Sequence, residues 1–165
     1  MPSEARDKLG DLPEWDLSDL FPAPNSPEIE AALKAADMAS RAFHARWIGK
    51  LAKSEGDALA EAIAEYERIQ DSLGRLMSYA QLVHAADMSD PEIGRFFQGV
   101  QERATEISSH LLFFQLELNR IDDSALDSRL AGSEALARYR PWLRDLRAMR
   151  PHQLDDALEK LLHEK

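Results

Sequence analysis

Three long stretches of the chain carry an apolar residue at every third or fourth position, which places apolar side chains on one face of an α-helix. The stretches predict helices over residues 27–52, 57–88 and 91–121. Their apolar positions are, in order, Ile29, Leu33, Ala36, Phe43, Trp47 and Leu51; Leu59, Ala62, Tyr66, Ile69, Leu73, Leu76, Ala80 and Val83; and Ile93, Phe97, Val100, Ala104, Ile107, Leu111, Phe114, Leu118 and Ile121.

The ends of these stretches carry helix start signals. Ser26 precedes Pro27 and Asp90 precedes Pro91, and a small polar residue before a proline favours the first turn of a helix. Because so few residues separate the second and third predicted helices, the two must lie antiparallel as a hairpin. At about 1.5 Å of rise per residue, each is roughly 45 Å long.

Shorter elements follow over residues 123–165. We expect a helix near 124–130, a break at Gly132, a helix over 134–149 interrupted at Pro141, and a last helix over 156–163 that begins after Asp155. No stretch shows the alternation typical of a strand. The sequence predicts an all-α fold: an elongated antiparallel helical bundle built on a long helical hairpin, with short C-terminal helices.

Residues 1–26 form a separate stretch, rich in proline and acidic residues, which predicts an irregular leader before a helical lobe over 27–165. The segment from Leu12 to Phe21 also contains Trp15, Leu17 and Leu20. We expect this much apolar surface to lie against this chain or against another part of a larger protein.

Composition narrows the classes of function. The 165 residues include 20 Lys and Arg against 30 Asp and Glu, a net charge of -10, which disfavours nucleic acid and anionic membranes as partners. No cysteine is present, so disulfides, Cys-bound zinc and thiol nucleophiles are excluded. With no signal-like N-terminus and no apolar run near the roughly 20 residues of a membrane span, a cytoplasmic location is expected.

Motifs for catalysis or metal binding are absent from the sequence. No two of the five histidines are four residues apart, and no glutamate stands three residues before a histidine, so neither H-E-x-x-H nor Glu-x-x-His occurs. No G-x-S-x-G or glycine-rich phosphate loop is found either. The sequence therefore predicts no catalytic residue, metal ligand or cofactor in this chain.

Two surfaces remain as candidate sites. The first is basic: Arg140, Arg144, Arg147 and Arg150, with Trp142 among them, form either a solvated face paired with the acidic bundle or a docking face for an acidic surface or a peptide carboxylate. Trp142 is equally consistent with a core position. The second surface is apolar, because residues 111–116 are apolar nearly all round a helix. Its candidate interface residues, for a partner helix or a homodimer, are Leu112, Phe113 and Leu116.

Several segments resemble one family. Residues 12–22, LPEWDLSDLFP, are similar to the opening of oligoendopeptidase F-type zinc metallopeptidases, relatives of thimet oligopeptidase. Residues 78–80 with Asp87, residues 108–118 reading SSHLLFFQLEL, and residues 136–162 resemble that family's N-terminal helices and the segment that closes them. The match runs from about residue 12 to 165 in the order of the family.

This resemblance implies the N-terminal helical domain of such a peptidase. Members carry H-E-x-x-H and a downstream glutamate ligand for zinc on a C-terminal catalytic domain, and no position here corresponds to them. The expected role is therefore a substrate-gating lobe, inactive alone, whose partners are the C-terminal catalytic domain and a short oligopeptide. The residues by themselves also allow a stand-alone helical interaction or dimerisation module.

Overall fold

A computed structural model describes residues 15–165, and within that range all regular structure is helical. The helices are α2 (Pro27–Trp47), α3 (Gly56–Ala86), α4 (Pro91–Ser109), α5 (Leu112–Arg120), α6 (Asp123–Gly132), α7 (Glu134–Ala137), α8 (Arg140–Ala148) and α9 (Asp156–Glu164), with 3₁₀ turns η1 (Leu51–Lys53) and η2 (Arg150–His152). The prediction of an all-α fold is confirmed.

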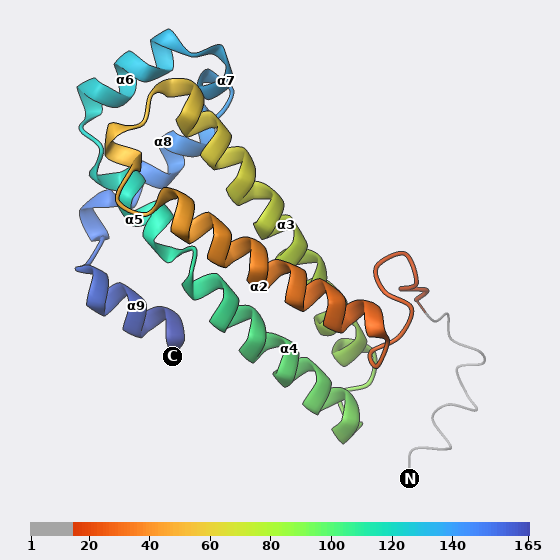
Figure 1. Ribbon diagram of the computed structural model, residues 1–165. Coiled ribbons are helices and arrows are strands. Elements are labelled where there is room, and N and C mark those ends of the chain that lie inside the picture. Colours follow the sequence, from red (N-terminus) through yellow and green to blue (C-terminus); the bar gives the residue numbers. More distant parts are fainter. Residues whose placement is uncertain (1–14) are drawn as a thin grey trace, which may run out of the picture.

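Helices α2, α3 and α4 lie side by side along the length of the molecule, each antiparallel to the next in sequence (Figure 1). They pack through the three predicted apolar seams, and nearly every seam residue is buried. Val83, Ile93 and Phe97, near the α3–α4 turn, are only partly buried. The spacing of apolar residues therefore identified the core of the hairpin correctly, because it reflects which face of each helix is turned inward.

The first helix is shorter than predicted. It ends at Trp47 instead of continuing to residue 52, and the chain then turns through Gly49 and forms η1. Gly49 has a φ of 71°, in the left-handed region that costs glycine least. Its N–H donates to the carboxylate of Glu117 on α5 over 2.7 Å, so the turn is tied to a distant helix.

The predicted helix over 91–121 is divided in two, and the prediction of one continuous element is wrong at this point. Helix α4 ends at Ser109 and α5 begins at Leu112. The hydroxyls of Ser108 and Ser109 donate to the carbonyls of Thr105 and Glu106 and so occupy acceptors of the last turn of α4. The amides of His110 and Leu111 then donate to the carbonyls of Ile107 and Ser108, three residues back, as in a 3₁₀ turn. The apolar seam continues across the break, which explains why periodicity did not reveal it.

An aromatic cluster joins α5 to the long helices. The Phe114 ring is fully buried, with its centroid 5.1 Å from that of Phe43 on α2 and 4.8 Å from that of Tyr66 on α3. The Tyr66 hydroxyl accepts hydrogen bonds from the amides of Gln70 and Gln115. Burial raises the pKa of Tyr66 above its ordinary value, because the apolar surroundings disfavour the charged form. This cluster fixes α5 in the interior.

Helices α6, α7 and α8 close the end of the bundle at which α3 begins, and α9 runs back beside α4 and α5 (Figure 1). Gly56, the first residue of α3, lies so close to the α6–α7 junction that an added Cβ would meet Ser133 Cβ at 2.6 Å and the Arg129 carbonyl at 2.8 Å. Any larger residue would therefore push the two segments apart. The break predicted at Gly132 falls one residue later, at Ser133, which caps α7, and the interruption predicted at Pro141 falls just before it, at residues 138–139.

The described part of the leader is irregular and lies on α3. Phe21 is buried against the edge of the Tyr79 ring, with centroids 5.3 Å apart. The Arg75 guanidinium donates to the carbonyls of Asp19 and Leu20. Trp15 is exposed, and Leu12 lies outside the described residues. The surface that covers the leader at Phe21 is therefore part of this chain.

Candidate functional site

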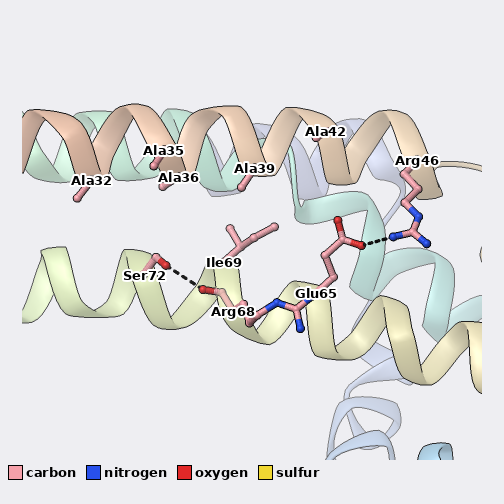
Figure 2. Close-up of a pocket in the computed structure, with 10 residues that line it drawn as sticks. All are labelled: Ala32, Ala35, Ala36, Ala39, Ala42, Arg46, Glu65, Arg68, Ile69 and Ser72. Atoms are coloured by element: carbon pink, nitrogen blue, oxygen red, sulfur yellow. Dashed lines mark hydrogen bonds and ion pairs between the residues drawn. The ribbon is translucent and has the colours of Figure 1, made fainter.

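A groove of about 540 Å³ lies between α2 and α3. One wall is a row of alanines on α2, and the other is formed by Ile69, the Arg68 stem and Ser72 on α3, as Figure 2 shows. The lining residues are Ala32, Ala35, Ala36, Ala39, Ala42, Arg46, Glu65, Arg68, Ile69 and Ser72. Because alanine side chains are short, they leave the space between the two helices unfilled.

One end of the groove is closed by an ion pair. The Arg46 guanidinium donates to Glu65 over 3.1 Å (Figure 2). It also donates to Glu61 over 2.7 Å, and the Trp47 indole N–H donates to Glu65. The hydrogen bond to Glu61 is the main reason that the pKa of Arg46 is raised. Arg68 forms no ion pair with any of residues 15–165 and is the free cation of the lining.

The groove can bind but offers no chemistry. Its lining holds no histidine, no nucleophile beside a base, and a single carboxylate that Arg46 already neutralises. An apolar trough with a cation on one wall has the character of a binding surface and not of a catalytic site. This groove was not predicted from the sequence, although alanines spaced by threes and fours from Ala32 to Ala42 indicate a surface that a second helix can approach closely.

The predicted basic face separates into two kinds of arginine. Arg147 is only 13% exposed and points into the molecule. It donates to the carbonyls of Leu118 over 3.0 Å and Ile121 over 2.6 Å, and it also pairs with the carboxylate of Asp123. It thus binds the orphan carbonyls at the end of α5 and the first acidic residue of α6.

The other members of that face lie at the surface. Arg150 reaches Asp123 at 3.4 Å, Arg144 pairs with the adjacent Asp145, and Arg140 is exposed without an ion pair among residues 15–165. Trp142 is half-buried on the core, with its ring 6.3 Å from that of Tyr66. The structure therefore brings Arg147 and Arg150 together at Asp123 and leaves Arg140 and Arg144 facing solvent.

The apolar candidate segment lies mostly within the chain. Phe113 packs on Phe43 and on His44, with centroid distances of 5.8 Å and 5.1 Å. Leu116 is only 7% exposed, and Leu112 is half-buried. Little of this segment is therefore available to a partner in the present conformation.

Two histidines meet near the α4–α5 break. The rings of His44 and His110 lie 6.2 Å apart, and Arg41, Asp37 and Glu106 surround them. Burial lowers the pKa of His110, and the Arg41 cation lowers it further. Within residues 15–165, no three side chains of His, Asp or Glu lie together as metal ligands. The described residues therefore do not fit a zinc ion.

Comparisons with known proteins agree with the resemblance in the sequence. Residues 117–165 match the family described as Oligopeptidase F. Over 157 residues the chain is 29% identical to Oligopeptidase PepF of Bacillus subtilis (strain 168), a match that covers 91% of this chain and 22% of that protein. No solved structure matches the chain.

These matches establish distant homology over most of the chain to the N-terminal region of oligopeptidase F, an M3-type peptidase family. The chain spans about a fifth of the length of that relative. No helix among residues 15–165 combines the length and the apolar character needed to cross a membrane.

Proposed function

We propose that this chain is the substrate-gating helical lobe of a zinc-dependent oligoendopeptidase that hydrolyses short peptides. The observation that carries the proposal is the similarity to Oligopeptidase PepF, which extends along 91% of the chain but covers only 22% of the relative. The catalytic zinc and its ligands would then belong to the remainder of the peptidase. The lobe would form part of the wall of the substrate chamber, and no catalytic step is assigned to its residues.

The geometry is consistent with a wall of a substrate chamber. The three long helices share one continuous core, as expected of a bundle that behaves as one rigid wall. A rigid wall can admit an extended short peptide while it excludes a folded protein by size. The α2–α3 groove and the free cation of Arg68 give this wall a place to contact a peptide backbone or a carboxylate.

A chimera tests the proposal. The region of Oligopeptidase PepF that the chain matches is replaced by this chain, and zinc content is measured together with cleavage of an internally quenched short peptide and of a folded protein. We expect the zinc-loaded chimera to cleave the short peptide and to leave the folded protein intact. The 165-residue chain by itself should cleave neither.

The result that would contradict the proposal is a folded, zinc-loaded chimera without peptidase activity, or peptide cleavage by the isolated chain.

The rival function, a stand-alone dimerisation module, predicts a dimer through Leu112, Phe113 and Leu116. Since Leu116 is buried, a charge at this position should unfold the chain instead of dissociating a dimer, so Leu112→Glu is the sharper probe of that interface.

A further inference from the structure

Polar contacts connect helix α9 to the bundle at both of its ends. Arg120 at the end of α5 pairs with Asp156 in the first turn of α9. Ser108 near the end of α4 lies in hydrogen-bond contact with His163 in the last turn, over 2.9 Å between Oγ and Nε2. The Asp155 carboxylate caps the helix by accepting from the amides of Ala157 and Leu158. These contacts fix α9 antiparallel to α4 and α5.

The apolar side chains of α9 point away from the core. Leu158 is 46% exposed, Leu161 is 49% exposed and Leu162 is 62% exposed, and Leu154 just before the helix is exposed as well. The three leucines of the helix lie within one stripe, as the core-facing side of an amphipathic helix does. No residue of α9 is buried, and the apolar core of the described chain contains no residue beyond Leu146.

Such a helix needs a second surface. A helix of nine residues is marginal in water without tertiary packing. The exposed leucines are also contiguous, unlike the isolated exposed Met38 and Met88 elsewhere on the molecule. The leucine face of α9, defined as Leu154, Leu158, Leu161 and Leu162, therefore has the character of one half of an interface.

The size of this face indicates what covers it. The helix is roughly 14 Å long and about 10 Å wide. A dimer built on α9 alone would fall far short of the roughly 1,200 Å² that a specific interface between separate proteins buries. A partner in the same polypeptide needs less area, since the covalent connection supplies a high effective concentration.

We infer that the leucine face of α9 is the docking surface for the catalytic part of the peptidase, which presents an apolar surface to it. This inference rests on the proposed function. It is supported by the family match, which extends through α9 to residue 165, and by the much greater length of the relative. The leucines would then form the interior of the junction between the two parts.

The chimera described above is also the test system. The double variant Leu158→Glu and Leu161→Glu places two charges on the face, and the matched control Met38→Glu and Met88→Glu places two charges at exposed methionines elsewhere. We expect the leucine variant to lose peptide cleavage by tenfold or more and to be cut by trypsin near the junction. The control should keep both activity and trypsin resistance.

Two readouts separate this inference from the proposed function. If the leucine variant keeps the activity and the trypsin resistance of the chimera, the inference is wrong while the proposed function stands. If the unsubstituted chimera is inactive but only the leucine variant gains trypsin sensitivity, the docking surface stands and the proposed function fails.

The isolated chain supplies the remaining control. Its thermal unfolding, followed by circular dichroism, should be nearly the same with and without the two glutamates, because the leucines are exposed there. Sedimentation velocity should show a monomer. A dimer that Leu158→Glu dissociates would overturn the inference in favour of a second copy as the occupant, and this experiment does not depend on folding of the chimera.

Discussion

Helices α5 and α9 are each nine residues long and rich in leucine, yet they have opposite positions in the molecule. In α5, Phe114, Leu116 and Leu118 are buried, and the helix packs against η1, α8 and the aromatic cluster. In α9, no residue is buried and three leucines face solvent. The sequence predicted an interface at the first of these segments, whereas the structure exposes the second.

This comparison shows that the apolar content of a helix does not indicate which surface covers it. The residues of α5 lie at the point where α2 turns back through η1, so several other elements reach them. Helix α9 packs mainly against α4 and α5, with polar contacts through Asp156 and His163. Stability of this chain should therefore depend strongly on α5 and weakly on α9.

The same substitution in both helices tests this comparison most strongly. Leu118→Ala should lower the free energy of unfolding by about 2 to 5 kcal/mol, because it leaves a cavity at a side chain that is 2% exposed. Leu161→Ala should change it by no more than about 0.5 kcal/mol. Urea unfolding of both variants, followed by circular dichroism, measures the two values. Equal losses would show that α9 is part of the folding unit.

Arg147 holds the end of α5 and Asp156 holds the start of α9, and we expect the next largest difference in the free energy of unfolding between variants of these two residues. Arg147→Ala should lower the free energy of unfolding by roughly 1.5 to 3 kcal/mol, since it removes a partly buried cation from the carbonyls of Leu118 and Ile121. Asp156→Ala breaks an exposed pair with Arg120 and should have an effect of less than about 1 kcal/mol.

Chemical denaturation provides the measurement for both anchors, and Arg147→Lys serves as the control for charge alone. A single ammonium cannot span both carbonyls in the way a guanidinium does, so the lysine variant should recover only part of the loss. Full recovery would mean that charge at this position, and not the bonds to the carbonyls, holds the end of α5.

The smallest expected effect is a pH dependence at the start of α5. Burial and the Arg41 cation keep the pKa of His110 below its ordinary value of 6.5, so the unfolded chain takes up the proton first. Stability from this group is complete above pH 6.5 and is lost as the pH falls through the lower folded pKa. His110→Gln should flatten the stability profile between pH 7 and 5, measured by thermal unfolding at each pH.

The control for this profile is His152→Gln, because His152 is an exposed residue of η2. The carboxylates Glu30 and Asp122 have lowered pKa values and titrate below this window, so they contribute little to it. An unchanged slope in the His110 variant would show that the histidine pair near the α4–α5 break is not what makes the fold sensitive to mild acid.

The helices and their buried faces could be predicted from the sequence because both depend on neighbours within one or two turns. The seam from Leu59 to Ala80 is buried as expected, and Asp90 caps α4 by accepting from the amide of Glu92. The break after Ser109 could not be predicted from periodicity, since the seam passes through it unchanged. Ser26 directly precedes α2 as expected, but its hydroxyl forms no cap bond.

The candidate site was less predictable, because it depends on which segments meet. Arg140, Arg144 and Arg147 share a helix face in the sequence pattern, yet only Arg147 reaches the end of α5. The groove needs α2 and α3 together, so no single segment could show it. The resemblance to the peptidase family was visible in short motifs, which do not depend on packing.

By itself, the sequence determined that this protein is helical, where its apolar faces lie and which family it resembles, because local periodicity, capping residues and motifs are properties of contiguous residues. Only the tertiary structure decided which apolar faces are covered. Burial is a relation between segments far apart in the chain, so Leu116 and Leu161 look alike in sequence while one lies inside the protein and the other faces solvent.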